Sequence, residues 1–309
     1  MLRALLVLLL AGCNVVHLHE RAMMRRAATA GLVHAEHRLG RDSLAVWRGG
    51  HGRPLLLLHG FGASALWQWD HQLRELSRRH ELVVPDLLGF GGSSGPDGDP
   101  SLDHQVRALI GLLDALDIEQ ADVVGVSYGG LVAYALAGAH PDRVRRLVMV
   151  DSPGHAWSID DHRAMLGRFA AESAAALLVP DTPAGVRTLV GIASHRPPRL
   201  PDAVARRVVA ELYDPHRADQ RALLDHLERE LERLAATLAR PTQPTLAIWG
   251  AHDPVFPIEV GRRLAADLDA PLVVIPRARH LPNAEHPRRF VAELEAFLDE
   301  TDREPGRAR

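Results

Sequence analysis

The sequence predicts an α/β fold in which a mostly parallel, doubly wound sheet carries a helical insertion. Seven short runs of apolar, often β-branched residues alternate with helical patterns along most of the 309 residues. Several of these runs are apolar at every position, as in strands that are covered on both faces. Strands that alternate with helices form parallel sheets with helices on either side.

The expected strands are bounded by residues that favour turns. In chain order they span residues 44–47, 55–58, 81–84, 123–126, 146–150, 245–249 and 272–275. Gly, Pro or Asp follows most of them within two residues. Helical patterns separate most of the strands and cover residues 69–79, 102–116, 131–140, 260–268 and 288–298.

Residues 155–240 break this alternation. They contain no β-branched strand run and are rich in Ala, Leu, Arg and Glu, with prolines at intervals. We expect about four helices here, which form a cap or lid over the strand ends. The α/β core then comprises residues 36–154 and 241–300, and residues 301–309 are expected to be a disordered tail.

The N-terminus has the pattern of an export signal. Met1-Leu2-Arg3 precedes an apolar run over residues 4–10 and then Ala11-Gly12-Cys13. This segment resembles the lipobox of bacterial lipoproteins, which implies a signal peptide over residues 1–12 and lipidation of Cys13 by acyl chains such as palmitate. Residues 13–35 are then a tether or a loosely packed helix. The alternatives are an ordinary signal peptide or a hydrophobic N-terminal helix.

The lipobox resemblance implies a protein anchored to a membrane of the cell envelope. Asn14, rather than Asp, follows Cys13, which by resemblance favours the outer membrane, on its periplasmic side. An ordinary signal peptide would instead give a secreted or periplasmic protein.

Composition excludes several other classes of function. A net charge of −3 argues against a nucleic-acid partner, because phosphate binding needs a basic surface. A single cysteine rules out an intramolecular disulfide and a cysteine-based metal cluster. We expect neither a metal nor another cofactor, since the spacing of His34 and His37 lacks the i, i+4 relation of a helical zinc site.

A candidate nucleophile lies between an expected strand and an expected helix. The run Val123–Val126 ends in the motif Gly125-Val126-Ser127-Tyr128-Gly129, which leads into a helical stretch. A sharp turn from strand to helix exposes the serine hydroxyl at its tip, and the glycines leave room for the crowded backbone.

The partners of Ser127 should lie at the carboxyl ends of neighbouring strands, where the sites of open parallel sheets are found. Asp253 follows the strand 245–249, and His280 follows the strand 272–275. His280 can act as a base for the serine, and a carboxylate can fix its tautomer. Asp151, after the strand 146–150, is an alternative acid. His252 and His286 are alternative bases.

These motifs together resemble the α/β-hydrolases over residues 42–298. The segments that carry the resemblance are His59-Gly60-Phe61-Gly62, Pro85–Ser94, Gly125–Gly130, Gly250–Asp253, and His280 with Glu285-His286-Pro287 and Phe290. The resemblance implies an oxyanion hole formed by the backbone N–H groups of Phe61 and Tyr128. It implies a triad of Ser127, His280 and Asp253.

A serine nucleophile narrows the reaction to acyl transfer and related chemistry, because epoxide hydrolases and haloalkane dehalogenases of this fold use a carboxylate. The motifs look most like bacterial lipases and esterases, which implies hydrolysis of a small-molecule ester or a lipid. They also resemble carbon–carbon bond hydrolases of aromatic ring cleavage, and a cofactor-free perhydrolase is a related alternative. A non-catalytic ligand-binding receptor is the third hypothesis. The expected lipid anchor favours the first.

Overall fold

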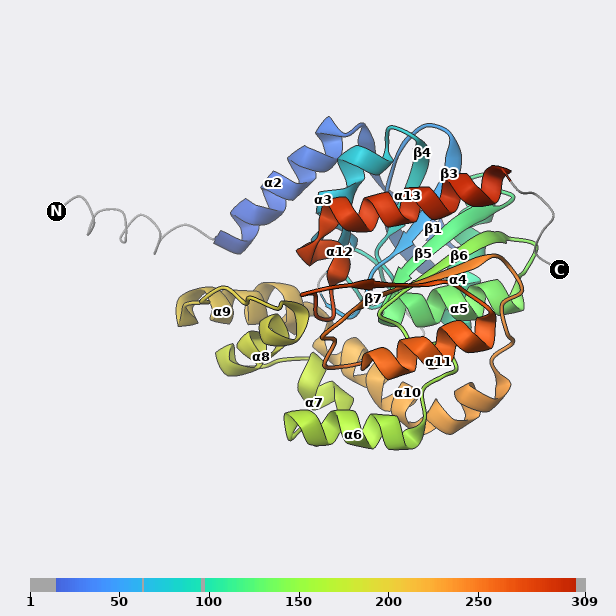
Figure 1. The fold of residues 1–309 in the computed structure, drawn as a ribbon. Helices are drawn as coiled ribbons and strands as arrows, with labels where there is room; N and C mark the ends of the chain where they lie inside the picture. Colours follow the sequence, from blue (N-terminus) through green and yellow to red (C-terminus); the bar gives the residue numbers. More distant parts are fainter. Residues whose placement is uncertain (1–14, 63, 96–97, 304–309) are drawn as a thin grey trace.

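The computed structural model describes residues 15–62, 64–95 and 98–303. Within them, eight strands form one sheet in the order β1-β2-β4-β3-β5-β6-β7-β8 (Figure 1). β1 and β2 pair antiparallel, as do β2 and β4, and the other pairs are parallel. The predicted mostly parallel sheet is therefore confirmed. The strands are β1 (Leu32–Leu39), β2 (Asp42–Gly50), β3 (Arg53–Leu58), β4 (His80–Pro85), β5 (Ala121–Val126), β6 (Val144–Val150), β7 (Thr245–Gly250) and β8 (Leu272–Ile275).

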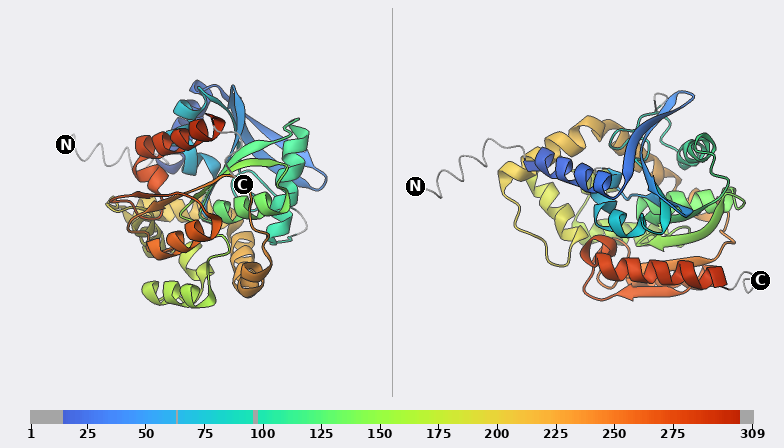
Figure 2. Two further views of the ribbon diagram at one scale, coloured as in Figure 1. Left: turned by 45° about the vertical axis from the view of Figure 1, so that its right-hand side comes forward. Right: turned by 90° about the horizontal axis from the view of Figure 1, so that it is seen from above.

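Helices cover both faces of the sheet (Figures 1 and 2). One face carries α2 (Val15–Thr29), α3 (Ala65–Leu76) and α13 (Pro287–Arg303), and the other carries α4 (Leu102–Ala115), α5 (Tyr128–Ala139) and α11 (Ile258–Leu268). β3 shows how one apolar run serves both layers. Leu55 and Leu57 pack in the core under α3, whereas Leu56 and Leu58 pack in the core under α5, because successive side chains of a strand point to opposite faces.

The predicted helical insertion lies between β6 and β7. It contains α6 (Ile159–Phe169), α7 (Ala174–Leu178), α8 (Pro183–Ala193), α9 (Asp202–Val208), a π-helix (Val209–Tyr213), a 3-10 helix (Asp214–His216) and α10 (Arg217–Thr237). Ser158, Ser173 and Thr182 begin α6, α7 and α8 by accepting a backbone N–H from the first turn. These caps fix where the three helices begin.

The N-terminal region forms a packed helix and an edge strand, where the sequence suggested a tether or a loosely packed helix. Residues 15–29 form α2, which buries Val16, Met23 and Ala27, and residues 32–39 form the edge strand β1. At the other end, α13 extends to Arg303, past the expected boundary at residue 300. The expected signal peptide, Cys13 and residues 304–309 lie outside the described residues. None of the described helices is both long and apolar enough to span a membrane.

Candidate active site

Ser127 lies at a strained turn between β5 and α5. Its φ of +52° and ψ of −118° are unusual for a residue with a side chain. Glycine is required at three positions around Ser127, because a side chain there would collide with neighbouring atoms. A Cβ on Gly125 would lie 2.3 Å from the carbonyl oxygen of Gly129, and one on Gly129 would lie 2.4 Å from that of His59. A Cβ on Gly130 would lie 2.4 Å from Ser152 Cβ. The turn can therefore form only with glycine at these three positions.

The structure brings together the three residues that the sequence singles out. His280 Nε2 lies 2.9 Å from Ser127 Oγ, and His280 Nδ1 lies 2.9 Å from Asp253 Oδ2. Asp253 has a fully buried side chain, and its Oδ1 accepts the Val255 N–H at 2.8 Å. A hydroxyl, an imidazole and a buried carboxylate thus form one hydrogen-bonded chain. This arrangement can remove the serine proton during attack on an electrophilic carbon.

The alternative residues have other partners. His252 stacks on His195 with ring centroids 5.1 Å apart, and His286 Nε2 lies 3.3 Å from the carbonyl oxygen of Arg277. Asp151 is fully buried at the end of β6, where its Oδ1 accepts the Gly250 N–H at 2.9 Å. Burial and the neighbouring Asp253 raise the pKa of Asp151 well above its usual value. Asp253, rather than Asp151, is hydrogen-bonded to His280.

Phe61 and Tyr128 flank Ser127 on two different elements. Because α5 begins at Tyr128, the N–H of this residue has no acceptor within the helix. Phe61 lies on the loop after β3, and its ring meets that of Tyr128 edge to face at a centroid distance of 5.8 Å. Both residues line the same cavity as Ser127. Both residues thus lie beside Ser127, and the donation of their backbone N–H groups to an oxyanion stays a prediction from the family resemblance.

Buried polar groups hold the loop that contains Phe61. His59 Nε2 accepts the Leu87 N–H at 2.9 Å, and its Nδ1 lies 2.7 Å from the Gly60 carbonyl oxygen. Asp86 accepts the backbone N–H groups of Ala65 and Gly92 at 2.7 and 2.9 Å. Burial lowers the pKa of His59, so its ring is neutral and can both donate and accept.

A second network joins this loop to the segment that follows His280. Gln68, on α3, accepts the Gly60 N–H at 3.4 Å through Oε1 and donates to Asn283 Oδ1 at 3.1 Å. Asn283 lies in α12 (Pro282–Glu285), is fully buried, and donates back to the Gln68 carbonyl at 3.1 Å. The loop with the candidate oxyanion donor and the segment with the candidate base are thus fixed to each other.

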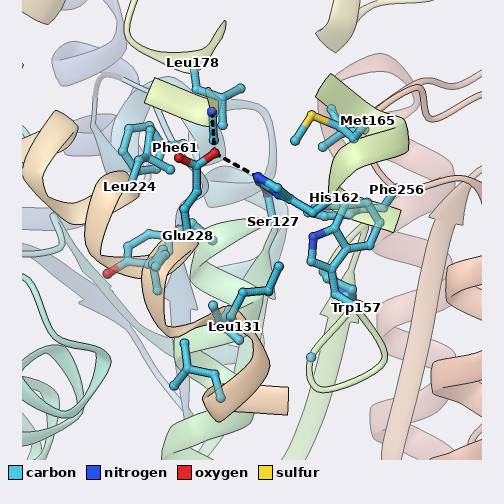
Figure 3. A pocket seen from close by; sticks show the side chains of 18 of the residues that line it. Phe61, Ser127, Leu131, Trp157, His162, Met165, Leu178, Leu224, Glu228 and Phe256 are labelled. Atoms are coloured by element: carbon cyan, nitrogen blue, oxygen red, sulfur yellow. Dashed lines mark hydrogen bonds and ion pairs between the residues drawn. The ribbon is translucent and has the colours of Figure 1, made fainter. Parts of the chain in front are cut away.

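Two cavities meet at Ser127. The smaller, of about 130 Å³, lies beneath α6, α7 and α10 and is mainly apolar (Figure 3). The larger, of about 590 Å³, lies between α2, α8 and α9 and also includes His280. Residues that line the smaller cavity include Leu131, Trp157, Met165, Leu178, Leu224 and Phe256, and those that line the larger include Val15, Val16, Trp67, Leu189, Val204 and Leu212.

The smaller cavity contains one polar pair that the sequence did not suggest. His162 Nε2 on α6 and the backbone N–H of Ala174 on α7 both lie 2.8 Å from Glu228 Oε1 on α10 (Figure 3). The two side chains are 66 positions apart, and neither has a local motif around it. No sequence signal could therefore identify them. Trp69 is fully buried in the core, whereas the nearby Trp67 lines the larger cavity.

Comparison with known proteins assigns the family. Residues 53–287 match the model of the alpha/beta hydrolase fold. A 2-hydroxymuconate semialdehyde hydrolase of Pseudomonas sp. (strain CF600) is 32% identical over 82% of this chain and 89% of its own length. Lipase 3 of Moraxella sp. (strain TA144) is 27% identical over 80% of this chain and 78% of its own. The crystal structure of a membrane phospholipase A, a bacterial virulence factor, superposes with a TM-score of 0.77 at 26% identity and covers 97% of this chain and 98% of its own.

The chain belongs to the α/β-hydrolase fold family, and it is a hydrolase. Relatives named as a semialdehyde hydrolase and as a lipase each match most of its length.

Proposed function

We propose that the protein hydrolyses carboxylic esters through an acyl-serine intermediate, with Ser127 as nucleophile, His280 as base and Asp253 as the acid that orients it. The observation that carries the proposal is the hydrogen-bonded chain Ser127–His280–Asp253 at the junction of two apolar cavities. An ester has a carbon group on each side of the bond that breaks. Two cavities that meet at the nucleophile suit such a substrate.

The proposed reaction has two halves. As Ser127 Oγ bonds to the acyl carbon, its proton moves to His280 Nε2, and the carbonyl oxygen becomes negative. The backbone N–H groups of Phe61 and Tyr128 donate to this oxygen. The bond to the alcohol oxygen then breaks, and the alcohol leaves with the proton from His280. Water repeats the sequence on the acyl-serine and releases the carboxylic acid.

The lining of the cavities favours a neutral acyl chain. A relative from Pseudomonas putida, 29% identical, is named 2-hydroxy-6-oxo-2,4-heptadienoate hydrolase and so acts on a carboxylate. A buried carboxylate needs a cationic partner. The described residues that line the two cavities include no arginine. His162 is already paired with Glu228, and His19, in the larger cavity, packs against the ring of Trp67. An uncharged ester avoids this desolvation cost.

The size of the smaller cavity suggests the length of the acyl group. An apolar cavity of about 150 Å³ accepts a molecule the size of benzene, and this one measures about 130 Å³. We assign the acyl group to it, with an optimum at roughly four to eight carbons by the same comparison. The alcohol portion then lies in the larger cavity.

Carbon–carbon bond hydrolysis is the second candidate. It is supported by the 32% identity to the 2-hydroxymuconate semialdehyde hydrolase over most of both chains. The same serine and histidine could serve this reaction, so the triad does not distinguish the two. The charge of the substrate distinguishes the two reactions, because ring-cleavage products of this kind carry a carboxylate.

We also propose that acyl chains on Cys13 attach the enzyme to a membrane of the cell envelope. α2 begins two residues after Cys13, and Val15 and Val16 line the larger cavity. The resemblance to a membrane phospholipase A over 97% of this chain is in line with this. Labelling of cells with radioactive palmitate should mark the wild type and not Cys13→Ser. Equal labelling of both would contradict the anchor.

Activity assays can test the reaction and the cavity assignment together. We expect hydrolysis of p-nitrophenyl esters, loss of that activity in Ser127→Ala, and little turnover of a ring-cleavage dienoate. Ala174 lines the smaller cavity and Ala193 the larger, which provides a matched pair. Ala174→Leu should shift the preferred acyl chain to shorter lengths, and Ala193→Leu should not. Faster turnover of the dienoate than of any ester would refute ester hydrolysis.

A further inference from the structure

Two buried carboxyl groups lie side by side behind the proposed base. Asp151 follows β6 and Asp253 follows β7, and neither side chain is accessible to solvent. Asp151, Asp253 and His280 each have a polar atom within 4.8 Å of the others. Two ionised carboxylates at such a distance repel strongly in a buried site. One of the two groups should therefore hold a proton.

The hydrogen bonds indicate which group holds it. Asp253 accepts a bond on each oxygen, from Val255 N–H at 2.8 Å and from the His280 ring at 2.9 Å. Asp151 accepts one bond, from Gly250 N–H on Oδ1, and its Oδ2 has no partner among the described residues. Donors stabilise the charged form of a carboxyl group. Asp253 is thus the ionised member of the pair.

We propose that Asp151 is a neutral carboxylic acid whose Oδ2–H donates a hydrogen bond to Asp253, which makes Asp151 a positioning residue for Asp253 and, through it, for His280. The hydrogen bond gives Asp151 Oδ2 the partner that it otherwise lacks. The proposal rests on the proposed triad and adds a fourth residue to it.

Two further features of Asp151 agree with this role. Its backbone has a φ of +40°, which a residue with a side chain rarely adopts, so this position is kept at a conformational cost. The groups that face its carboxyl are Asp253, His280 and Glu285, and burial together with the charge on Asp253 raises its pKa well above the usual range.

The test uses the rate at which a fluorophosphonate labels Ser127 as a function of pH, which needs no knowledge of the substrate. Asp151→Ala should slow labelling by about 10- to 100-fold, the usual effect of one hydrogen bond to a charged group. Asp151→Asn should restore most of the rate, since its amide N–H can donate to Asp253. The pH midpoint of labelling should be the same in wild type and Asp151→Asn, because both carry a neutral group at this position.

A charged Asp151 would give the opposite result. Its replacement by Asn would then remove a negative charge beside His280 and move the labelling midpoint to lower pH. Glu285→Gln, which removes the other facing carboxylate, is the control that shows the size of such a shift. Equal labelling rates in wild type and Asp151→Ala would also overturn the proposal. A labelling rate that falls on treatment with EDTA would overturn it as well, because a metal would then be bound by Asp151, Asp253 and His280.

Infrared spectroscopy gives a readout that does not depend on reactivity. The wild type should show a buried carboxylic-acid C=O band at neutral pH that Asp151→Asn lacks, and identical spectra would refute the proposal even if Asp151→Ala failed to fold. If the wild type is not labelled at Ser127, the proposed function fails, whereas the infrared comparison still decides the state of Asp151.

Discussion

At the scale of single residues, the site is built on two strained positions at the ends of neighbouring strands. Ser127 follows β5 and Asp151 follows β6, and both have positive φ values. Such positions cost about 1–3 kcal/mol each, and they persist where the surroundings fix them. Here the surroundings are close backbone contacts and hydrogen bonds to the next strand, such as that from Gly250 to Asp151.

Gly129→Ala should disrupt the site through backbone contacts alone. The new Cβ would lie 2.4 Å from the His59 carbonyl oxygen and 2.6 Å from that of Leu58, and neither atom can move freely. We expect a loss of about 1–3 kcal/mol in the free energy of unfolding and a large fall in kcat/KM as the Phe61 loop shifts. Urea unfolding and ester kinetics measure the two effects.

Gly167→Ala is the matched control, because nothing lies within 4 Å of its Cβ position on α6. It should stabilise the protein by up to about 1 kcal/mol, since alanine favours helix more than glycine does. A similar loss of stability in both variants would show that the contact is not the cause.

His59 should make the fold sensitive to acid. Its folded pKa is lowered by burial, so the native state resists a proton that the unfolded chain takes up near pH 6.5. Stability is therefore present above this pH and lost as the pH falls through it, by at most about 1.4 kcal/mol per unit. The free energy of unfolding should fall less between about pH 7 and pH 5 in His59→Gln than in wild type. Parallel slopes would contradict this.

At the scale of secondary structure, the sequence signal was strong where a strand is covered on both faces. Leu55–Leu58 and Val123–Val126 are buried throughout, and their apolar runs predicted β3 and β5 closely. β1 was missed because it is an edge strand whose one fully buried residue is Leu32. α2 was missed as a packed helix because its buried residues, Val16, Met23 and Ala27, lie among His and Arg.

The site was predictable to the extent that its residues follow strands. Ser127 comes directly after β5, and Asp253 and His280 lie in the loops that follow β7 and β8, so the order of strands brought them to one end of the sheet. Glu228 and His162 lie within helices of the insertion, where helical periodicity gives no information on which face meets the cavity. Their contact depends on tertiary packing between α6 and α10.

An ion pair attaches α2 to the core. Arg26 donates to both carboxylate oxygens of Asp70 on α3, at 2.6–3.1 Å, and the Asp70 side chain is almost completely buried. Arg26→Ala should lower the free energy of unfolding by about 1.5–3 kcal/mol, because it leaves a buried carboxylate without its partner. In the double variant Arg26→Ala/Asp70→Asn, urea unfolding should show a smaller loss of unfolding free energy than the sum of the losses in the two single variants. Strict additivity would mean that the pair does not interact.

At the scale of the whole molecule, a second buried ion pair lies at the amino-terminal ends of the central strands, at the opposite end of the sheet from the site. Arg146, at the start of β6, donates to both oxygens of Asp122 in β5 and also to Leu298 O and Thr301 Oγ1 on α13. Both charged side chains are nearly inaccessible to solvent. Two central strands and the last helix are thus connected far from the catalytic edge.

Arg146→Ala should therefore separate stability from catalysis. Loss of one partner of a buried ion pair costs about 3–5 kcal/mol, so the melting temperature should fall markedly. Labelling of Ser127 by the fluorophosphonate should stay near the wild-type rate at temperatures where the variant remains folded. A large fall in that rate, with unchanged melting temperature, would contradict this division.

In the proposed reaction the alcohol departs before the acid because the acyl group stays bonded to Ser127. The two cavities determine which path each product can take. With the acyl group in the smaller cavity and the alcohol in the larger, as proposed above, departure of the alcohol opens space beside His280. The water for the second half-reaction can enter by that path while the acyl chain stays covered by α6 and α10. A high concentration of a nucleophilic alcohol should then compete with water and yield a new ester. Under the proposed ester hydrolysis, the protein should therefore transfer its acyl group to an alcohol when alcohol outnumbers water at the larger cavity.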